Sequence, residues 1–263
     1  VTVPVHVTQY VAAMVPLADT IRFSALGAQR RVEYEVRDDR GRVVADTSAA
    51  LSVADTSIAR LGGVCVQAVA PGLTTSSLVL APAAASIPVG VQQRVGSLRL
   101  VRDTIRLDAL RDTPTVNPIV HDSLGSPIPD PVLEDDVSDS TVATFATERT
   151  LQALATGATT VTVRDPVTGI ATSAPVVVRQ VIARIRVTPP EIAFDALGDT
   201  LRIGAVAEDR LGSVVPGAAL EFSIQDVQVA VFESASRLRS VSPGQTLVVV
   251  SDPGNLGVLG APG

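Results

Sequence analysis

Residues 31–37 read Arg-Val-Glu-Tyr-Glu-Val-Arg, with an apolar or aromatic side chain at every second position and charged side chains between them. A period of two puts alternate side chains on opposite faces, so this segment is predicted to be a strand with one buried face. The run ends at Asp38, and Gly41 follows three residues later. Asp accepts backbone hydrogen bonds at the start of a turn and Gly supplies positive φ, so Asp38-x-x-Gly41 predicts a tight turn.

Alternation of this kind is the dominant pattern of the chain, and no segment of helical length shows a 3.6-residue period with caps. The fold class predicted is therefore all-β. The clearest further strands are predicted at residues 1–8, 20–23, 104–107 and 160–163.

The turn motif recurs as Asp122-x-x-Gly125 and Asp209-x-x-Gly212, 84 and then 87 residues further along. Three other landmarks keep a similar spacing: Gln9, Gln93 and Gln180; Pro4, Pro88, Pro175 and Pro262; Gly72, Gly157 and Gly244. Self-similarity at a fixed period indicates tandem structural units. We predict repeats at 10–93, 94–180 and 181–263, preceded by residues 1–9 as an extra copy of a last strand.

A third match lies between these landmarks, at Val53–Ala59, Val137–Ala143 and Ile224–Ala230. Together with the Asp-x-x-Gly turn before it and the glycine after it, this motif resembles the bacterial Ig-like family, group 2. The resemblance covers nearly the whole chain. It implies Ig-like sandwiches arranged end to end, as in stalks of surface adhesins and other extracellular repeat proteins, and it implies no enzyme.

One position departs from the family pattern. An aromatic residue, usually Trp, lies in that family four residues before the Asp of this motif, inside the sandwich. Here the three places hold Leu51, Asp135 and Phe222. Because a carboxylate is a poor core residue, we expect a local shift in the middle repeat to bring Leu133 or Val137 into the inward place.

Composition excludes several classes of partner. The net charge is −6, which disfavours nucleic acid and anionic membranes. No apolar run is long enough to span a membrane, and no secretory signal is present. The single cysteine, Cys65, lies in an apolar run and is expected to be a buried structural thiol. Because the chain starts at Val1, we expect a processed N-terminus or an excerpt of a longer protein.

Catalytic groups are sparse. The two histidines, His6 and His121, fall in different repeats, and no nucleophile elbow, Cys/His cluster or phosphate loop is present. The acidic run 134–136 with Asp139 is interpreted as a solvated loop rather than a cation site. One Asp per turn supplies too few ligands for calcium. We therefore expect no enzymatic activity, no cofactor and no metal.

The ends of the chain are out of phase with its repeats. Residues 5–9 match 176–180, the predicted last strand of the middle repeat, whereas the third repeat reaches Pro262 where that strand would begin. A sandwich lacking an edge strand exposes its core and unpaired backbone groups. We predict completion by strand addition, with Val1, Val3, Val5 and Val7 as the donor strand and an acceptor edge at Val258 and Leu259.

This arrangement predicts a head-to-tail homopolymer, because the two contact surfaces differ. Burial of four valines would contribute about 6–12 kcal/mol before association entropy is subtracted. The expected function is a structural subunit of an extracellular fibre, with other cell-surface components as further partners. The alternative is a stalk fragment of a long surface adhesin, in which the same strand completes a neighbouring repeat through the covalent chain and binding resides elsewhere.

Overall fold

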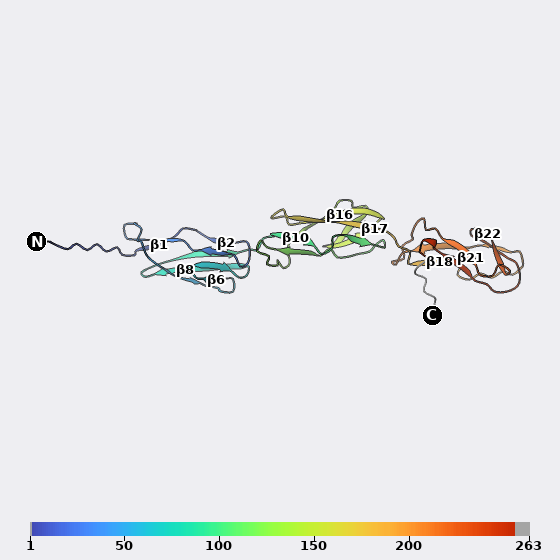
Figure 1. Ribbon diagram of the computed structural model, residues 1–263, viewed down its shortest axis with the longest axis horizontal. Coiled ribbons are helices and arrows are strands. Elements are labelled where there is room, and N and C mark those ends of the chain that lie inside the picture. The colour runs from blue at the N-terminus through green and yellow to red at the C-terminus, as the bar shows by residue number, and fades with distance from the viewer. Residues whose placement is uncertain (1, 256–263) are drawn as a thin grey trace. The chain divides into compact units, whose positions relative to one another are not determined.

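The computed structural model describes residues 2–255, whose regular secondary structure is β-strand apart from a short 3-10 helix at Pro253–Asn255 (Figure 1). The all-β prediction is confirmed. The chain forms two compact units: Val1–Val101, Pro118–Glu134 and Val163–Thr172 make one, and Arg102–Asn117, Asp135–Thr162 and Ser173–Gly263 make the other. The middle repeat contributes to both units, so the division into three domains stays a prediction. Repeats 1, 2 and 3 denote residues 10–93, 94–180 and 181–263 below.

Repeat 1 contains a four-stranded sheet. Its first strand in sequence order pairs in parallel with its last strand in sequence order. Its strands, in spatial order, are β2 (Ile21–Phe23), β9 (Ala83–Val91), β8 (Gly72–Leu80) and β5 (Ala50–Val53). The long hairpin β8–β9 forms its centre. The remaining strands pair as β1 (Ala13–Pro16) with β4 (Tyr34–Arg37), and as β3 (Gln29–Arg31) with β7 (Cys65–Ala68) and β6 (Ala59–Gly62).

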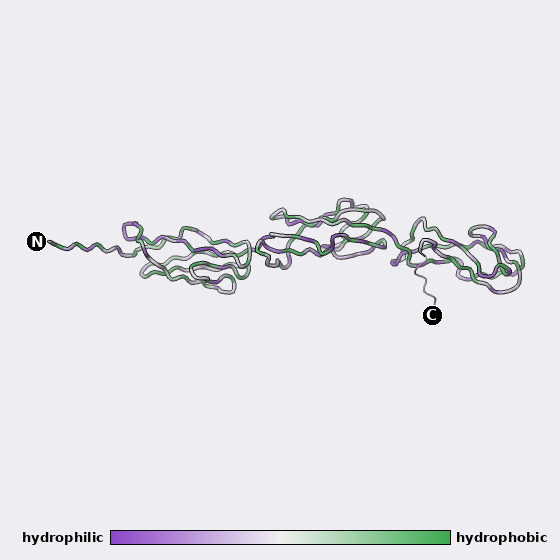
Figure 2. Tube along the Cα trace, in the orientation of Figure 1, coloured by the Kyte–Doolittle hydropathy of each residue, from purple (hydrophilic) through white to green (hydrophobic). Residues whose placement is uncertain are grey.

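This order is that of an Ig-like sandwich. In one sheet, β1 is strand A, β3 and β4 together are strand B, β7 is strand E and β6 is strand D. In the opposite sheet, β2 is strand A′, β9 is strand G, β8 is strand F and β5 is strand C. Side chains from both sheets meet in one core, which includes Phe23, Val89 and Leu78 from one sheet and Val66 from the other. The alternation of hydrophobic and hydrophilic residues that creates this core is visible along the strands in Figure 2.

Repeat 2 has the same strand order, except that the counterpart of β3 is reduced to an isolated bridge between Thr115 and Thr150. Its sheets are β11 (Ile105–Leu107), β17 (Ala171–Val178), β16 (Gly157–Arg164) and β13 (Glu134–Val137); β10 (Ser97–Leu100) with β12 (Pro118–His121); and β14 (Ala143–Thr147) with β15 (Thr150–Ala153). The parallel pairing of A′ with G recurs, because Ile105 lies opposite Val176 as Ile21 lies opposite Val89.

The expected shift around Asp135 is wrong. Asp135 is half-buried and both of its neighbours, Glu134 and Asp136, are exposed, so burial alternates along β13 in the same phase as along β5. A slip by one residue would turn Glu134 and Asp136 into the core, which costs more than one inward carboxylate. Burial raises the pKa of Asp135, and the charge of Arg149 offsets this only in part.

Repeat 3 has fewer strands among the described residues. The pairs are β18 (Arg184–Thr188) with β20 (Gly204–Glu208); β19 (Thr200–Arg202) with β23 (Arg237–Ser240) and β22 (Ala230–Ser234); and β21 (Glu221–Ile224) with β24 (Val248–Ser251). These are A, B, E, D, C and F. Up to Asn255, no strand of repeat 3 takes the places of A′ and G.

Candidate assembly site at the strand groove and the joints between repeats

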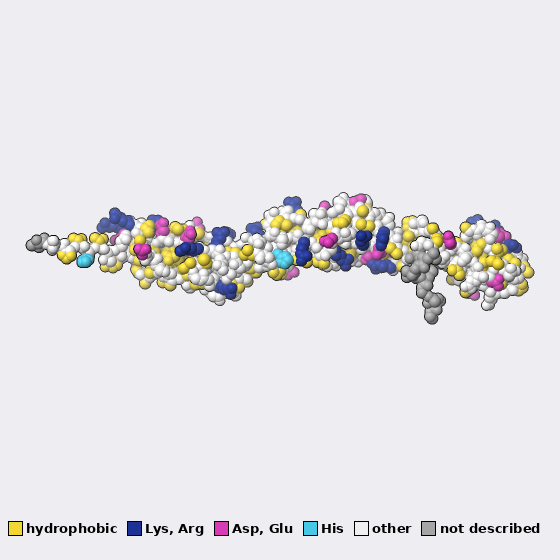
Figure 3. Space-filling model, viewed as in Figure 1, with side chains coloured by type: hydrophobic (Ala, Val, Ile, Leu, Met, Phe, Trp, Pro, Cys, Tyr) yellow, Lys and Arg dark blue, Asp and Glu magenta, His cyan; other side chains and the backbone are white. Residues whose placement is uncertain are grey.

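The N-terminal segment forms no strand over residues 2–9, so the strand predicted at residues 1–8 is not formed within the described part of the chain. Its alternate valines are open to solvent: Val3 is 77%, Val5 82% and Val7 89% exposed. Hydrophobic side chains along this segment are visible in Figure 3. Val1, the fourth predicted donor residue, lies outside the described residues.

The matching positions of the two complete G strands are buried. Pro4 aligns with Pro88 and Pro175, so the three valines align with Ile87, Val89 and Val91 in β9 and with Ala174, Val176 and Val178 in β17. All six of these side chains are at most 4% exposed. Residues 3, 5 and 7 therefore carry the inward pattern of a G strand without a sandwich to receive it.

In repeat 3, no residue up to Asn255 occupies the place of strand G, and this place is called the groove below. The segment 192–194 lies on its A′ side. Ile192 and Phe194 align with Ile21 and Phe23 of β2, yet this segment forms no strand and both side chains are only half-buried. In repeat 1 the aligned Ile21 and Phe23 are each 4% exposed. The strand A′ is held by its parallel pairing with G in repeats 1 and 2, so its absence here follows from the absence of that pairing among residues 2–255.

The F side of the groove is likewise incomplete. Strand F begins at Gly72 in repeat 1 and at Gly157 in repeat 2, but β24 begins only at Val248 although Gly244 is the matching glycine. The last part of the strand keeps its pairing with β21. Residues 244–247, whose counterparts in repeat 1 pair with β9, form no strand, and Leu247 is 63% exposed.

The predicted acceptor residues Val258 and Leu259 lie outside the described residues. Among the described residues, the place of strand G in repeat 3 is flanked instead by the half-buried side chains Ile192, Phe194, Thr246 and Val248, which sequence reasoning missed. A signal for the first two was present, because residues 191–194 stand 87 positions after the predicted strand 104–107 and keep its apolar alternation.

The landmark residues Gln and Asp meet at the joints between repeats. At the first joint the Gln93 side-chain amide donates to Asp122 Oδ2 at 3.0 Å and to the Pro127 carbonyl at 3.2 Å. The Leu26 N–H, from the loop after β2, donates to the same Oδ2 at 2.9 Å. Asp122 therefore accepts hydrogen bonds from two residues of repeat 1, and it is 2% exposed.

The second joint repeats this geometry. Gln180 donates to Asp209 Oδ2 and to the Val214 carbonyl, both at 3.0 Å. The Leu110 N–H donates to Asp209 Oδ2 at 3.0 Å, and Asp209 is again 2% exposed. This joint has two further links: an ion pair between Arg210 and Asp112, and hydrogen bonds from Arg111 to the Leu211 carbonyl and to Ser213.

The other carboxylate oxygen of each joint aspartate holds its own turn. Asp122 Oδ1 accepts the Leu124 and Ser126 amides, each at 3.0 Å, so the Asp-x-x-Gly motif forms the predicted turn. Asp38 holds the first turn in the same way and accepts from Gln9 at 3.2 Å. Asp38 is only half-buried, and among residues 2–255 it receives no amide from another repeat.

The hydrogen bonds determine the electrostatics of the joints. Burial raises the pKa of Asp122, but the hydrogen bonds from Gln93 and from backbone amides outweigh it, so that the pKa lies below its usual range. The same balance lowers the pKa of Asp209, with Gln180 as its side-chain donor. For Asp38 the bond from the Arg42 amide is the largest cause of a lowered pKa. The three carboxylates are therefore ionised at neutral pH.

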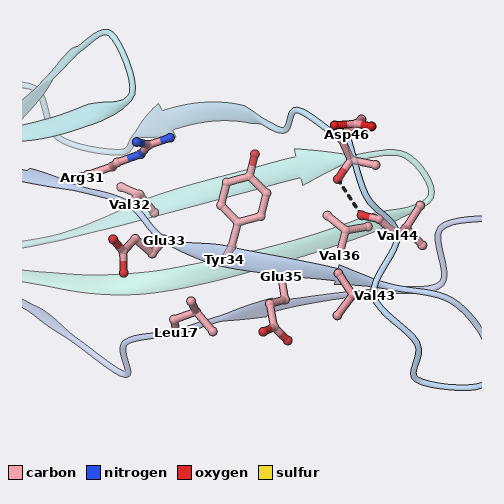
Figure 4. Close-up of a pocket in the computed structure, with 11 residues that line it drawn as sticks. Leu17, Arg31, Val32, Glu33, Tyr34, Glu35, Val36, Val43, Val44 and Asp46 are labelled. Carbon is pink, nitrogen blue, oxygen red and sulfur yellow. Dashed lines mark hydrogen bonds between the residues drawn. The ribbon is translucent and has the colours of Figure 1, made fainter.

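The remaining chemical groups do not converge on a site. Among residues 2–255, neither His6 nor His121 hydrogen-bonds through its side chain, and no group of three potential metal-ligating side chains occurs. A pocket of about 450 Å³ lies beside β4 in repeat 1. Figure 4 shows Tyr34 on one side of that strand and Glu33 and Glu35 on the other. No helix within the described part of the chain is long and apolar enough to cross a membrane.

Comparison with known proteins gives only distant structural likeness. No protein-family model matches the chain, and no curated protein matches it in sequence. Among solved structures, the Escherichia coli adhesin FdeC has a TM-score of 0.38 at 15% identity, covering 95% of each chain. Invasin, a bacterial integrin-binding protein, has 0.36 at 16% identity, covering 93% of this chain and 56% of its own.

The S-layer protein rSbsC(31-844) has a TM-score of 0.33 at 14% identity over 93% of this chain. The chain spans 37% of that S-layer protein's length. Likeness at this level is too weak to assign a function or a partner. The Ig-like fold is instead established by the strand order of this chain itself.

Proposed function

We propose that this chain is a structural subunit of an extracellular fibre in which residues 1–9 of one copy add to repeat 3 of the next as its G strand. One observation carries the proposal: Val3, Val5 and Val7 are exposed, although the same positions of both complete G strands are buried. In repeat 3, no strand among residues 2–255 takes the places of A′ and G, and the proposed donor strand would fill the place of G. The extracellular location rests on the resemblance of the repeated motifs to bacterial Ig-like repeats.

The two complete repeats specify the register of the added strand. Val89 lies opposite Ile21 in the parallel pairing and opposite Thr74 in the antiparallel pairing. By alignment, Val5 of the incoming copy would lie between Ile192 and Thr246. Val3 would then lie opposite Val248, and Val7 opposite Phe194 and Gly244. Each valine would enter the core of repeat 3, where the described buried cluster is small.

The energy of such a contact is sufficient for association. Burying Val3, Val5 and Val7 contributes about 4.5–9 kcal/mol, at about 1.5–3 kcal/mol each. Two rows of backbone hydrogen bonds replace bonds to water and add modestly. The loss of translational and rotational freedom subtracts several kcal/mol. We therefore expect reversible association that depends on protein concentration.

A matched pair of substitutions tests the proposal. Val5→Asp puts a carboxylate into the groove, whereas Thr2→Asp changes a residue whose counterparts Ser86 and Ser173 are exposed. Sedimentation velocity over a range of concentrations should show head-to-tail oligomers for the wild type and for Thr2→Asp, and monomers for Val5→Asp and for a chain lacking residues 1–9. A folded wild-type chain that stays monomeric at high concentration would contradict the proposal, as would oligomers of Val5→Asp.

The second candidate is a stalk segment of a longer cell-surface adhesin, with its binding function outside these residues. It is favoured by the joints, where β9 and β17 run directly through Gln93 and Gln180 into the following repeat. Residues 1–9 would then be the last strand of a preceding repeat in the same chain. A peptide of residues 1–9 would bind repeat 3 under either candidate, whereas only the fibre subunit would self-assemble.

A further inference from the structure

We infer that the contact between copies includes a second element besides the added strand: Asp38 of the incoming copy accepts the Leu197 N–H of repeat 3. The inference rests on the proposed function, since it describes how the same two copies meet. In this contact, Asp38 would accept a backbone N–H from the other copy, as Asp122 and Asp209 accept one from the preceding repeat of the same chain.

The two internal joints share one set of three hydrogen bonds, two of which cross between the repeats. After β9, the Gln92 N–H donates to the Phe23 carbonyl and the Arg94 N–H to the Ser24 carbonyl, both at 2.9 Å. The third bond is that from the Leu26 N–H to Asp122. In the preceding repeat, the bonded groups are the Phe23 and Ser24 carbonyls and the Leu26 N–H, all backbone groups on the A′ strand or the loop after it.

The second joint reproduces the set with different residues. The Arg179 N–H donates to the Leu107 carbonyl at 2.9 Å, and the Val181 N–H to the Asp108 carbonyl at 3.0 Å. The Leu110 N–H completes it by donating to Asp209. Because the sequence differs at these places while the bonds do not, the backbone path and the aspartate are what the joint requires.

Repeat 3 has the backbone groups for a third set of these hydrogen bonds. Alignment places the acceptors of repeat 3 at the Phe194 and Asp195 carbonyls and the donor at the Leu197 N–H. Among residues 2–255, the Leu197 N–H makes no hydrogen bond. Leu197 is 63% exposed, whereas the aligned Leu26 and Leu110 are half-buried.

The N-terminal half offers the complementary groups. Thr8 and Tyr10 align with Gln92 and Arg94, and neither of their amides is hydrogen-bonded within the described residues. Gln9 already holds Asp38 Oδ2, at 3.2 Å, as Gln93 holds Asp122. A carboxylate oxygen can accept a further donor, and Asp38 is ionised because its pKa is lowered. An amide arriving at Oδ2 would therefore complete a charge-assisted hydrogen bond.

Binding between two full-length chains tests this contact apart from strand addition. Val5→Asp chains, which can accept a strand but cannot donate one, are immobilised, and soluble chains are passed over them at concentrations below self-association. We expect Asp38→Asn to bind about tenfold to a hundredfold more weakly than the wild type, since one charge-assisted bond is lost and an NH2 group faces the Leu197 N–H or Gln9. The control Asp39→Asn, at an exposed position of the same turn, should bind as the wild type does.

Amide hydrogen exchange gives an independent readout. The Leu197 amide should exchange more slowly in the wild-type complex than in free chains, and this protection should be lost with Asp38→Asn while that of residues 192–194 persists. Wild-type affinity for Asp38→Asn, or an unprotected Leu197 amide, would overturn the inference and leave strand addition standing. Absence of any wild-type binding would overturn both proposals.

Discussion

Asp122→Asn is the substitution that most directly probes how the repeats are joined. Asp122 accepts four N–H donors: Leu26 and Gln93 at Oδ2, and Leu124 and Ser126 at Oδ1, at distances of 2.9–3.0 Å. Asparagine has nearly the same shape but only one acceptor oxygen. Whichever way the amide is turned, its NH2 group faces two of these donors.

The cost follows from this count. A hydrogen bond to a charged group contributes about 1.5–3 kcal/mol, and a buried donor left without an acceptor carries a further penalty. Two such bonds are lost at a residue that is 2% exposed. Small movements of the turn recover part of the loss, so we expect a decrease of about 3 kcal/mol in the free energy of unfolding.

Urea unfolding followed by circular dichroism measures this loss, and Asp38→Asn is the matched control. Asp38 holds the same kind of turn but accepts only Gln9 at Oδ2, in a more exposed place, so its substitution should lower stability far less. Faster exchange of the Leu26 amide in Asp122→Asn would locate the damage at the joint. A loss no greater than that of Asp38→Asn would refute the assignment of Asp122 as the residue that joins two repeats.

Three further outcomes are expected. The lowered pKa of Asp209 means that its contribution to stability is complete above the usual Asp value of 3.8 and is lost as the pH falls through the lower folded-state value, so thermal unfolding between pH 7 and pH 2 should show acid destabilisation that Asp209→Asn reduces. Gly157→Ala should destabilise by about 1–3 kcal/mol, because φ is +155° and the new Cβ would lie 3.0 Å from Val142 Cγ2; Gly62→Ala, with open space around it, should be nearly neutral in urea unfolding. The raised pKa of Asp135 makes its ionised form destabilising above that pKa, so Asp135→Asn should raise the urea midpoint at pH 7, with a gain that disappears on acidification.

Most strands of repeats 1 and 2 were predictable because they have one buried face. The exception is β3, whose three residues are all exposed, and the strand predicted at 31–37 is divided between β3 and β4. The segments 20–23 and 104–107 alternate in sequence, and β2 and β11 alternate in burial in the same phase. The Asp-x-x-Gly turns were equally predictable, since their bonds are local. Period and turn chemistry are properties of a few neighbouring residues, which is why they can be read directly from a sequence.

The groove and the joints could not be derived in that way. Whether residues 192–194 form a strand depends on a partner far away in the chain, although their sequence pattern matches that of β2. The role of Gln93 depends likewise on Asp122, 29 residues away. The inward place of Asp135 was misjudged for the same reason, because the register of β13 is determined by the whole strand rather than by one unfavourable side chain.

The constant spacing of the landmarks has a physical explanation in the joints. Each Gln precedes its Asp by 29 residues, and in all three pairs the Gln side chain bonds the Asp. A residue inserted between them would displace the turn from the donor loop of the preceding repeat. Length varies instead between strands F and G, where β8 and β9 are joined by two residues and β16 and β17 by six, and this connection supplies none of the shared joint bonds. The Gln9–Asp38 pair keeps the same spacing and the same bond, as the proposed contact with repeat 3 of another copy requires.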